Sequence, residues 1–99
     1  MDAYNHFAPT IALIKFKRII LQLDLHSRRA LLDKCIEYVG ENSTQLRTWF
    51  EKARLLSDYD TQNDLRKNEL RSSEFWEELF AMNTEDVLRE ILMEVLRLD

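Results

Sequence analysis

One cluster of side chains has the spacing of a cation site, and it lies between residues 58 and 69. Five oxygen-bearing residues match the ligand positions of an EF-hand-like loop: Asp58, Asp60, Gln62, Asp64 and Glu69. Asn63 stands where the sharp turn of such a loop needs glycine, and no second loop of this kind occurs in the chain. Acidic loops between helices produce this spacing by chance, so we expect a solvated acidic loop over residues 58–63, with calcium binding as the less favoured hypothesis.

Groups suited to acid–base or nucleophilic catalysis are few and far apart. His6 lies near the start of the chain and His26 at the start of a predicted helix, and neither belongs to a recognisable motif. Cys35, the only cysteine, falls within an apolar series at helical spacing, which indicates a buried thiol. The single glycine, Gly40, excludes the glycine-rich phosphate-binding motifs. We therefore expect no enzymatic activity, no metal site and no cofactor.

The composition is typical of one small acidic domain. The 99 residues include 14 Lys and Arg against 18 Asp and Glu, for a net charge of −4, and 45% of them are apolar. A lone cysteine forms no internal disulfide, which favours a cytoplasmic protein. The most apolar stretch, residues 11–25, is interrupted by charged residues and is shorter than the roughly 20 residues that span a bilayer. We expect no membrane-spanning segment.

Helical periodicity and the scarcity of turn residues predict an all-α domain, a compact bundle of five or six short helices. We expect an N-terminal arm over residues 1–8, three helices over 9–57, the acidic loop over 58–63 and acidic amphipathic helices over 64–99. Asp24 or Ser27 should start the second helix and Gly40 should end it, at a positive φ. Asn42 and Gln45 form a capping-box pattern at the start of the third.

The first predicted helix, from Pro9 to about Leu23, is apolar over more than half of its circumference. Its polar stripe is limited to Lys15, Arg18 and Gln22. A helix of this kind must contact neighbours on more than one side. It is therefore either the central helix of the bundle or part of an oligomer interface.

The acidic residues gather near the C-terminus, where residues 72–99 hold eight Asp and Glu against two Arg. Two short helices there, the second beginning after a capping oxygen at Asn83 or Thr84, alternate large apolar residues with carboxylates. Acidic amphipathic helices suit a basic or apolar groove of another protein, although such carboxylates also merely solvate the outside of a bundle. Our leading hypothesis is a non-enzymatic adaptor or regulatory protein, with a homodimer as one form. The predicted protein-binding residues are Phe75, Trp76, Leu79, Phe80, Ile91 and Leu92 with Glu77 and Glu78.

Residues 45–54 resemble the recognition helix of a homeodomain, in which a Trp–Phe pair, here Trp49 and Phe50, anchors a helix flanked by basic residues. The resemblance covers about a third of the chain and implies a helix-turn-helix over residues 28–57. Lys52 stands where the family has the asparagine that reads adenine, and residues 1–8 carry no basic arm. The alternative function is a DNA-binding regulator with contacts from Arg28, Arg29, Arg47, Thr48, Glu51, Lys52 and Arg54.

Overall fold

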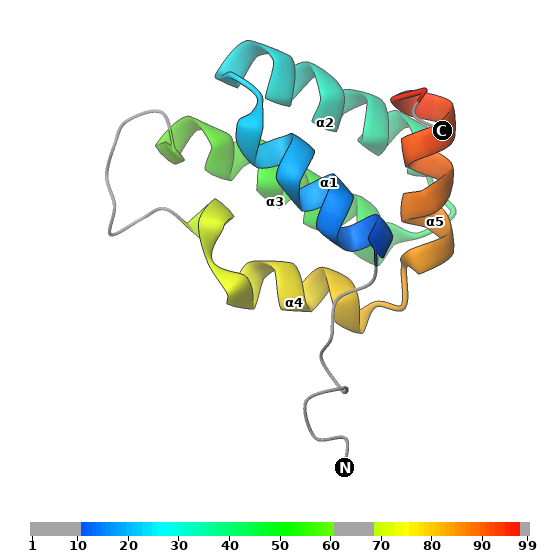
Figure 1. Cartoon of the computed structure of the whole chain (residues 1–99). Coiled ribbons are helices and arrows are strands. Elements are labelled where there is room, and N and C mark those ends of the chain that lie inside the picture. Colours follow the sequence, from blue (N-terminus) through cyan, green and yellow to red (C-terminus); the bar gives the residue numbers. More distant parts are fainter. Residues whose placement is uncertain (1–10, 61–68, 98–99) are drawn as a thin grey trace.

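The computed structural model describes residues 11–60 and 69–97, and this part of the chain is all-α, without a strand (Figure 1). Five α-helices follow one another: α1 (Ile11–Gln22), α2 (Leu25–Val39), α3 (Thr44–Asp60), α4 (Ser73–Ala81) and α5 (Glu85–Glu90). A 3₁₀ turn, η3 (Glu69–Arg71), precedes α4, and a π-helical turn, η4 (Ile91–Val95), continues α5. The prediction of a compact all-α bundle is confirmed.

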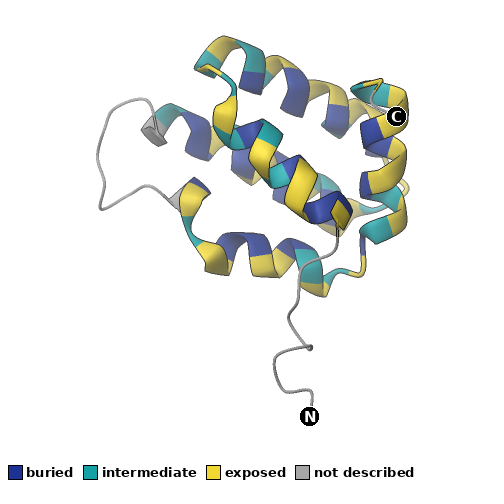
Figure 2. Cartoon of the chain, in the orientation of Figure 1, coloured by how far each residue is buried: buried dark blue, intermediate teal, exposed yellow. Residues whose placement is uncertain are grey.

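α1 crosses one side of the bundle, between α2 and α4 and in front of α3 in the view of Figure 1. Its inward face buries Ala12, Leu13, Phe16 and Ile20. The side chains of Phe16 and Ile20 are completely buried, so each contributes the full free energy of apolar burial. The opposite face of the same helix has no described neighbour and stays exposed (Figure 2).

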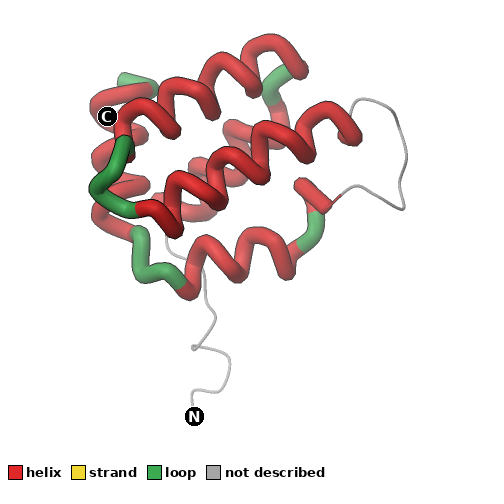
Figure 3. The backbone as a smooth tube through the Cα atoms, turned by 180° about the vertical axis from the view of Figure 1, so that it is seen from behind, coloured by secondary structure: helices red, strands yellow, loops and turns green. Residues whose placement is uncertain are grey.

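α2 and α3 form an antiparallel hairpin. The contacts between them show that the two helices run in opposite directions, because later residues along α2 contact earlier residues along α3. The contacts are Arg29 with Asp58, Asp33 with Arg54, and Gly40 with Arg47. The two helices therefore run side by side over most of their length, as Figure 3 also shows. Helices of a helix-turn-helix cross at about 90–120° instead. The predicted helix–turn–helix order exists, but not its crossed arrangement.

Local signals explain most helix ends. The Asp24 carboxylate accepts the backbone N–H of Ser27 at 2.8 Å and starts α2, and Gly40 ends it at φ 56°. The capping-box prediction for α3 was wrong by one residue. Ser43, not Asn42, caps this helix, since its hydroxyl accepts the N–H of Leu46 at 3.2 Å.

The start of α5 also differs from the prediction. Thr84 stands at the N-cap but makes no capping hydrogen bond. Its buried hydroxyl donates instead to the carbonyl oxygen of Leu79 at 3.1 Å, which ties the turn to the end of α4. Asn83 takes the positive φ of 60° in this turn, which asparagine tolerates better than most residues. α5 consequently leaves α4 at a steep angle (Figure 1).

An aromatic cluster forms the centre of the core. Phe16 from α1, Trp49 and Phe50 from α3, and Phe75 and Trp76 from α4 meet with ring centroids 4.4–6.2 Å apart. Most of these pairs are edge-to-face, the geometry that aromatic quadrupoles favour. The indole N–H of Trp76 donates to the carbonyl oxygen of Leu70 at 2.6 Å. The cluster thus joins three helices and η3 through one apolar centre.

Candidate interaction surface

Five of the six apolar residues predicted to bind a protein are buried in the core and present no side chain to a partner: Phe75, Trp76, Leu79, Ile91 and Leu92. Only Phe80 is half-exposed, and Glu77 and Glu78 lie on the outer face of α4. The physical reason is that these short helices each have one apolar stripe, and the bundle uses that stripe to close its own core. Of the apolar residues predicted to bind a protein over residues 72–99, only Phe80 therefore remains accessible beside the carboxylates.

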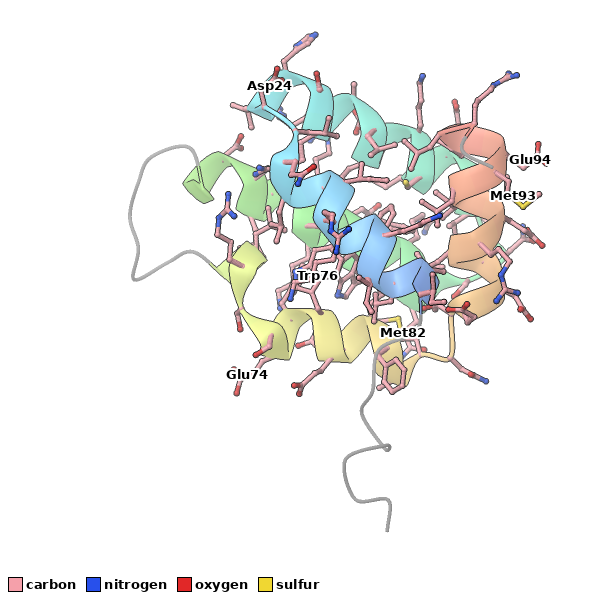
Figure 4. All side chains as sticks on the ribbon, in the orientation of Figure 1. Asp24, Glu74, Trp76, Met82, Met93 and Glu94 are labelled. Atoms are coloured by element: carbon pink, nitrogen blue, oxygen red, sulfur yellow. The ribbon has the colours of Figure 1, made fainter. Side chains whose placement is uncertain are left out.

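Exposed apolar side chains occur instead on α1. Ile11 is 75% exposed and Ile14 41% exposed, and both lie on the face of α1 that points away from the core. Met93 of η4, 55% exposed, shares a hollow with Ile11. Figure 4 shows Met93 pointing outward from the end of the bundle, whereas Trp76 points from α4 toward α1. The exposed apolar face of α1 was foreseen only as one of two alternatives, the oligomer interface.

A groove follows the seam between α1 and α4 and continues past η3. It consists of three adjoining hollows, because Leu13 and Phe80 line both the first and the second, and Ile14 and Lys17 line both the second and the third. The hollow beside η3 measures about 480 Å³. We call this feature the α1–α4 groove, and its walls are Leu13, Ile14, Lys17, Arg18, Leu21, Gln22, Arg71, Ser73, Trp76, Glu77, Phe80, Ala81, Asn83, Thr84, Glu85 and Leu88.

The groove has a basic side. α1 contains no acidic residue, and its three cations, Lys15, Lys17 and Arg18, make no ion pair with any described residue. The ammonium of Lys17 lies 5.8 Å from the ring centroid of Trp76, a cation–π distance, and so forms part of the groove wall. Lys17 and Arg18 thus place two positive charges beside exposed Ile14 along the groove, whereas Lys15 lines the hollow on the other flank of α1.

A second hollow lies on the other side of α1, against α5 and η4. Ile11 and Met93 line it together with Lys15 and the Arg89–Glu85 ion pair, whose nitrogen and oxygen are 2.6 Å apart. In the π-helical turn beside this hollow, the backbone N–H of Leu96 donates to the carbonyl oxygen of Ile91 at 3.1 Å. α1 is thus bordered by a depression along each of its exposed flanks.

Of the seven residues proposed for DNA contact, the four arginines all have partners within the bundle. Arg28 is buried, which contradicts its assignment as a phosphate contact. Its guanidinium donates to the carbonyl oxygens of Ile20 at 2.9 Å and Leu23 at 3.0 Å, so it caps the C-terminal end of α1. Sequence reasoning missed this role because a run of two arginines gives no sign of which one turns inward.

The three other arginines proposed for DNA contact have acidic or carbonyl partners. Arg29 pairs with Asp58 at 3.4 Å, Arg54 pairs with Asp33, and Arg47 donates to the carbonyl oxygen of Gly40 at 3.2 Å. Thr48, Glu51 and Lys52 are exposed on α3. Paired cations neutralise fewer phosphates, and phosphate neutralisation supplies most of the affinity for DNA. The hairpin geometry and these pairs together disfavour the DNA-binding alternative.

The cation-site pattern does not have EF-hand geometry at its start. Asp58 and Asp60 belong to α3, which continues to residue 60, whereas an EF-hand begins its loop at the first ligand. Gln62 and Asp64 lie outside the described residues, and the side chain of Glu69 is likewise not described. Within the described part of the chain, no three His, Cys, Asp or Glu side chains gather as a metal site would require.

The remaining reactive groups are separate. Burial raises the pKa of the Cys35 thiol to about 12, so the thiolate that a nucleophile needs is suppressed. His26 is exposed at the start of α2, and His6 lies outside the described residues. Comparison with protein-family models, with curated proteins and with solved structures finds no match to this chain. Among the described helices, none has both the length and the apolar character needed to cross a bilayer.

Proposed function

We propose that this chain is a non-enzymatic protein-interaction domain, acting as an adaptor or regulator, and that it binds its partner along the exposed face of α1. The observation that carries the proposal is the position of Ile14. This side chain is 41% exposed on α1 and lines two adjoining hollows of the α1–α4 groove. An apolar residue in a groove gains more from a partner than one on a convex surface, because both walls lose water together.

The neighbours of Ile14 support the same function. Half-exposed Phe80 lines the groove from the α4 side, and half-exposed Leu21 lines it two helical turns beyond Ile14 on α1. Aromatic and aliphatic anchors in pockets, surrounded by polar residues, are the usual energetic centre of a protein interface. The α1 residues that line the groove run from 13 to 22, about 15 Å of helix, so the groove accommodates a helix of about three turns.

Site-specific photo-cross-linking in the source organism tests this function. A benzoylphenylalanine placed at position 14 should give a discrete adduct with another polypeptide. The matched control position is Leu55, which is 61% exposed on α3 but lines none of the described hollows. Adducts of equal yield from positions 14 and 55, or none from position 14, would overturn the proposal.

A further inference from the structure

We infer that the partner of the α1–α4 groove is an acidic amphipathic helix, and this inference rests on the proposed function. The groove combines apolar positions with positive charge along one helix. Lys17 and Arg18 alternate with Ile14 and Leu21 in the hollow beside η3, and Arg71 closes its far end. Among the described residues no acidic side chain lines this hollow, whereas Glu77 and Glu85 line the other two hollows of the groove. A ligand that presents apolar groups together with negative charge is therefore complementary to this hollow.

The absence of internal partners strengthens the charge argument. Elsewhere on the described body Arg29, Arg54 and Arg89 are paired with nearby carboxylates, whereas Lys34 and Lys52 make no ion pair with a described residue. Lys15, Lys17 and Arg18 have no such ion pair among the described residues, although the chain carries more acids than bases. Unpaired cations beside an apolar groove make a complementary carboxylate favourable and a further cation unfavourable.

The shape of the groove selects a helix as the bound element. Ile14 and Leu21 lie seven residues apart on α1, two helical turns, and both line the groove, so they form one edge along it. A helix with apolar residues at every third or fourth position places its own ridge alongside and points its polar face outward. Carboxylates flanking that apolar ridge then lie within reach of Lys17 and Arg18.

A second copy of this chain is a weaker fit. Its α4 offers outward carboxylates at Glu74, Glu77 and Glu78, but the apolar residues of that helix are buried in its own core, except for half-exposed Phe80. Docking of α4 into the groove of another copy would bring charge without apolar anchors. It would also be a head-to-tail contact, which forms open chains unless it closes into a ring.

The test uses the full chain, labelled with ¹⁵N, and two synthetic peptides of about four helical turns. One peptide carries Leu at every third or fourth position with Glu elsewhere, and the other has Lys in place of every Glu. The acidic peptide should shift amide resonances of α1 and α4, bind more tightly than the basic one, and lose affinity as salt is added.

Charge-reversal variants test whether the acidic peptide binds in the groove or elsewhere on the surface. Lys17→Glu with Arg18→Glu should weaken binding of the acidic peptide by about tenfold or more. The matched control, Lys34→Glu with Lys52→Glu, changes the net charge equally on exposed positions of α2 and α3 and should leave the affinity within about twofold. Circular dichroism of each variant confirms that the bundle is intact.

Every other outcome overturns the inference in a distinguishable way. Equal binding of both peptides would mean that the groove takes apolar helices without regard to charge, and the proposed function would stand. Preference for the basic peptide would assign a basic partner. Concentration-dependent dimerisation that Lys17→Glu with Arg18→Glu abolishes would make a second copy the occupant. Binding of neither peptide, together with a position-14 adduct in the cross-linking experiment, would assign a partner that is not an acidic helix.

Discussion

Trp49 stacks on the ring of Phe75 with centroids 4.4 Å apart, while its indole N–H donates to the carbonyl oxygen of the same Phe75 at 3.0 Å. Trp49 of α3 therefore contacts the start of α4 in two ways, through the stacked face of its indole ring and through its indole N–H. The hydrogen bond pairs the N–H of the buried indole, which is its only donor. An unpaired N–H at this position would be costly to bury. This contact joins segments 26 residues apart in the chain.

Trp49→Ala should lower the free energy of unfolding by roughly 3–5 kcal/mol, because it leaves a cavity at the aromatic centre and removes the hydrogen bond to the Phe75 carbonyl oxygen. The shift of the urea midpoint measures this loss. Leu55→Ala is the control, since Leu55 on the same helix is exposed, and it should change stability by no more than about 0.5 kcal/mol. Equal effects of the two substitutions would show that Trp49 is not part of the core.

Arg28→Ala should destabilise the bundle by about 1–3 kcal/mol, because the carbonyl oxygens of Ile20 and Leu23 lose their donor. Arg29→Ala, one residue further along α2, removes only a partly exposed ion pair with Asp58 and should cost at most about 1 kcal/mol. Chemical denaturation of both variants makes the comparison. A larger loss for Arg29→Ala than for Arg28→Ala would contradict the capping role.

Tyr38 should titrate above its usual pKa near 10. Its hydroxyl donates to the Glu90 carboxylate at 2.8 Å, and this hydrogen bond, together with partial desolvation and the negative charges of Glu90 and Glu94, raises the pKa of the phenol. The contribution to stability is present below the unfolded pKa and is lost as the pH rises through the higher folded pKa. NMR titration of the Tyr38 ring carbon bearing the hydroxyl measures the pKa.

The variant Glu90→Gln should bring the pKa of Tyr38 down toward its usual value. It should also remove most of the stability difference between the native chain and Tyr38→Phe at neutral pH. Above the folded pKa that difference should vanish in the native background as well. A pKa of Tyr38 unchanged by Glu90→Gln would show that the hydrogen bond does not form in solution.

Gly40→Ala should destabilise the α2–α3 hairpin by about 1–3 kcal/mol. Gly40 has φ 56° and ψ −127°, a conformation that residues with a side chain rarely adopt. The cost is conformational, because an added Cβ would meet only the Glu37 carbonyl oxygen, at an ordinary 3.7 Å. Glu41→Ala at the exposed neighbouring position should leave the thermal midpoint nearly unchanged. A midpoint for Gly40→Ala equal to that of Glu41→Ala would contradict this explanation.

The amino-acid sequence by itself determined the helices and several of their ends. Trp49 and Phe50 were recognisable as core residues from their helical spacing, and Asp24 and Gly40 marked the two ends of α2. These features are legible because helix periodicity, capping and positive φ depend on residues a few positions apart. Ser43 and Thr84 were misjudged, because several polar residues in each turn could supply the cap.

The tertiary structure alone decided which side chains face solvent, and with it the candidate site. Periodicity shows that α4 and α1 each have an apolar face, but not which neighbours cover it. In this fold the apolar stripe of α4 that contains Trp76 packs into the core, while Ile14 of α1 remains exposed. Likewise Arg28 is buried, while Arg29 is partly exposed. Such outcomes depend on contacts between segments distant in the chain, and the free energy of burial distinguishes them only once the helices have packed.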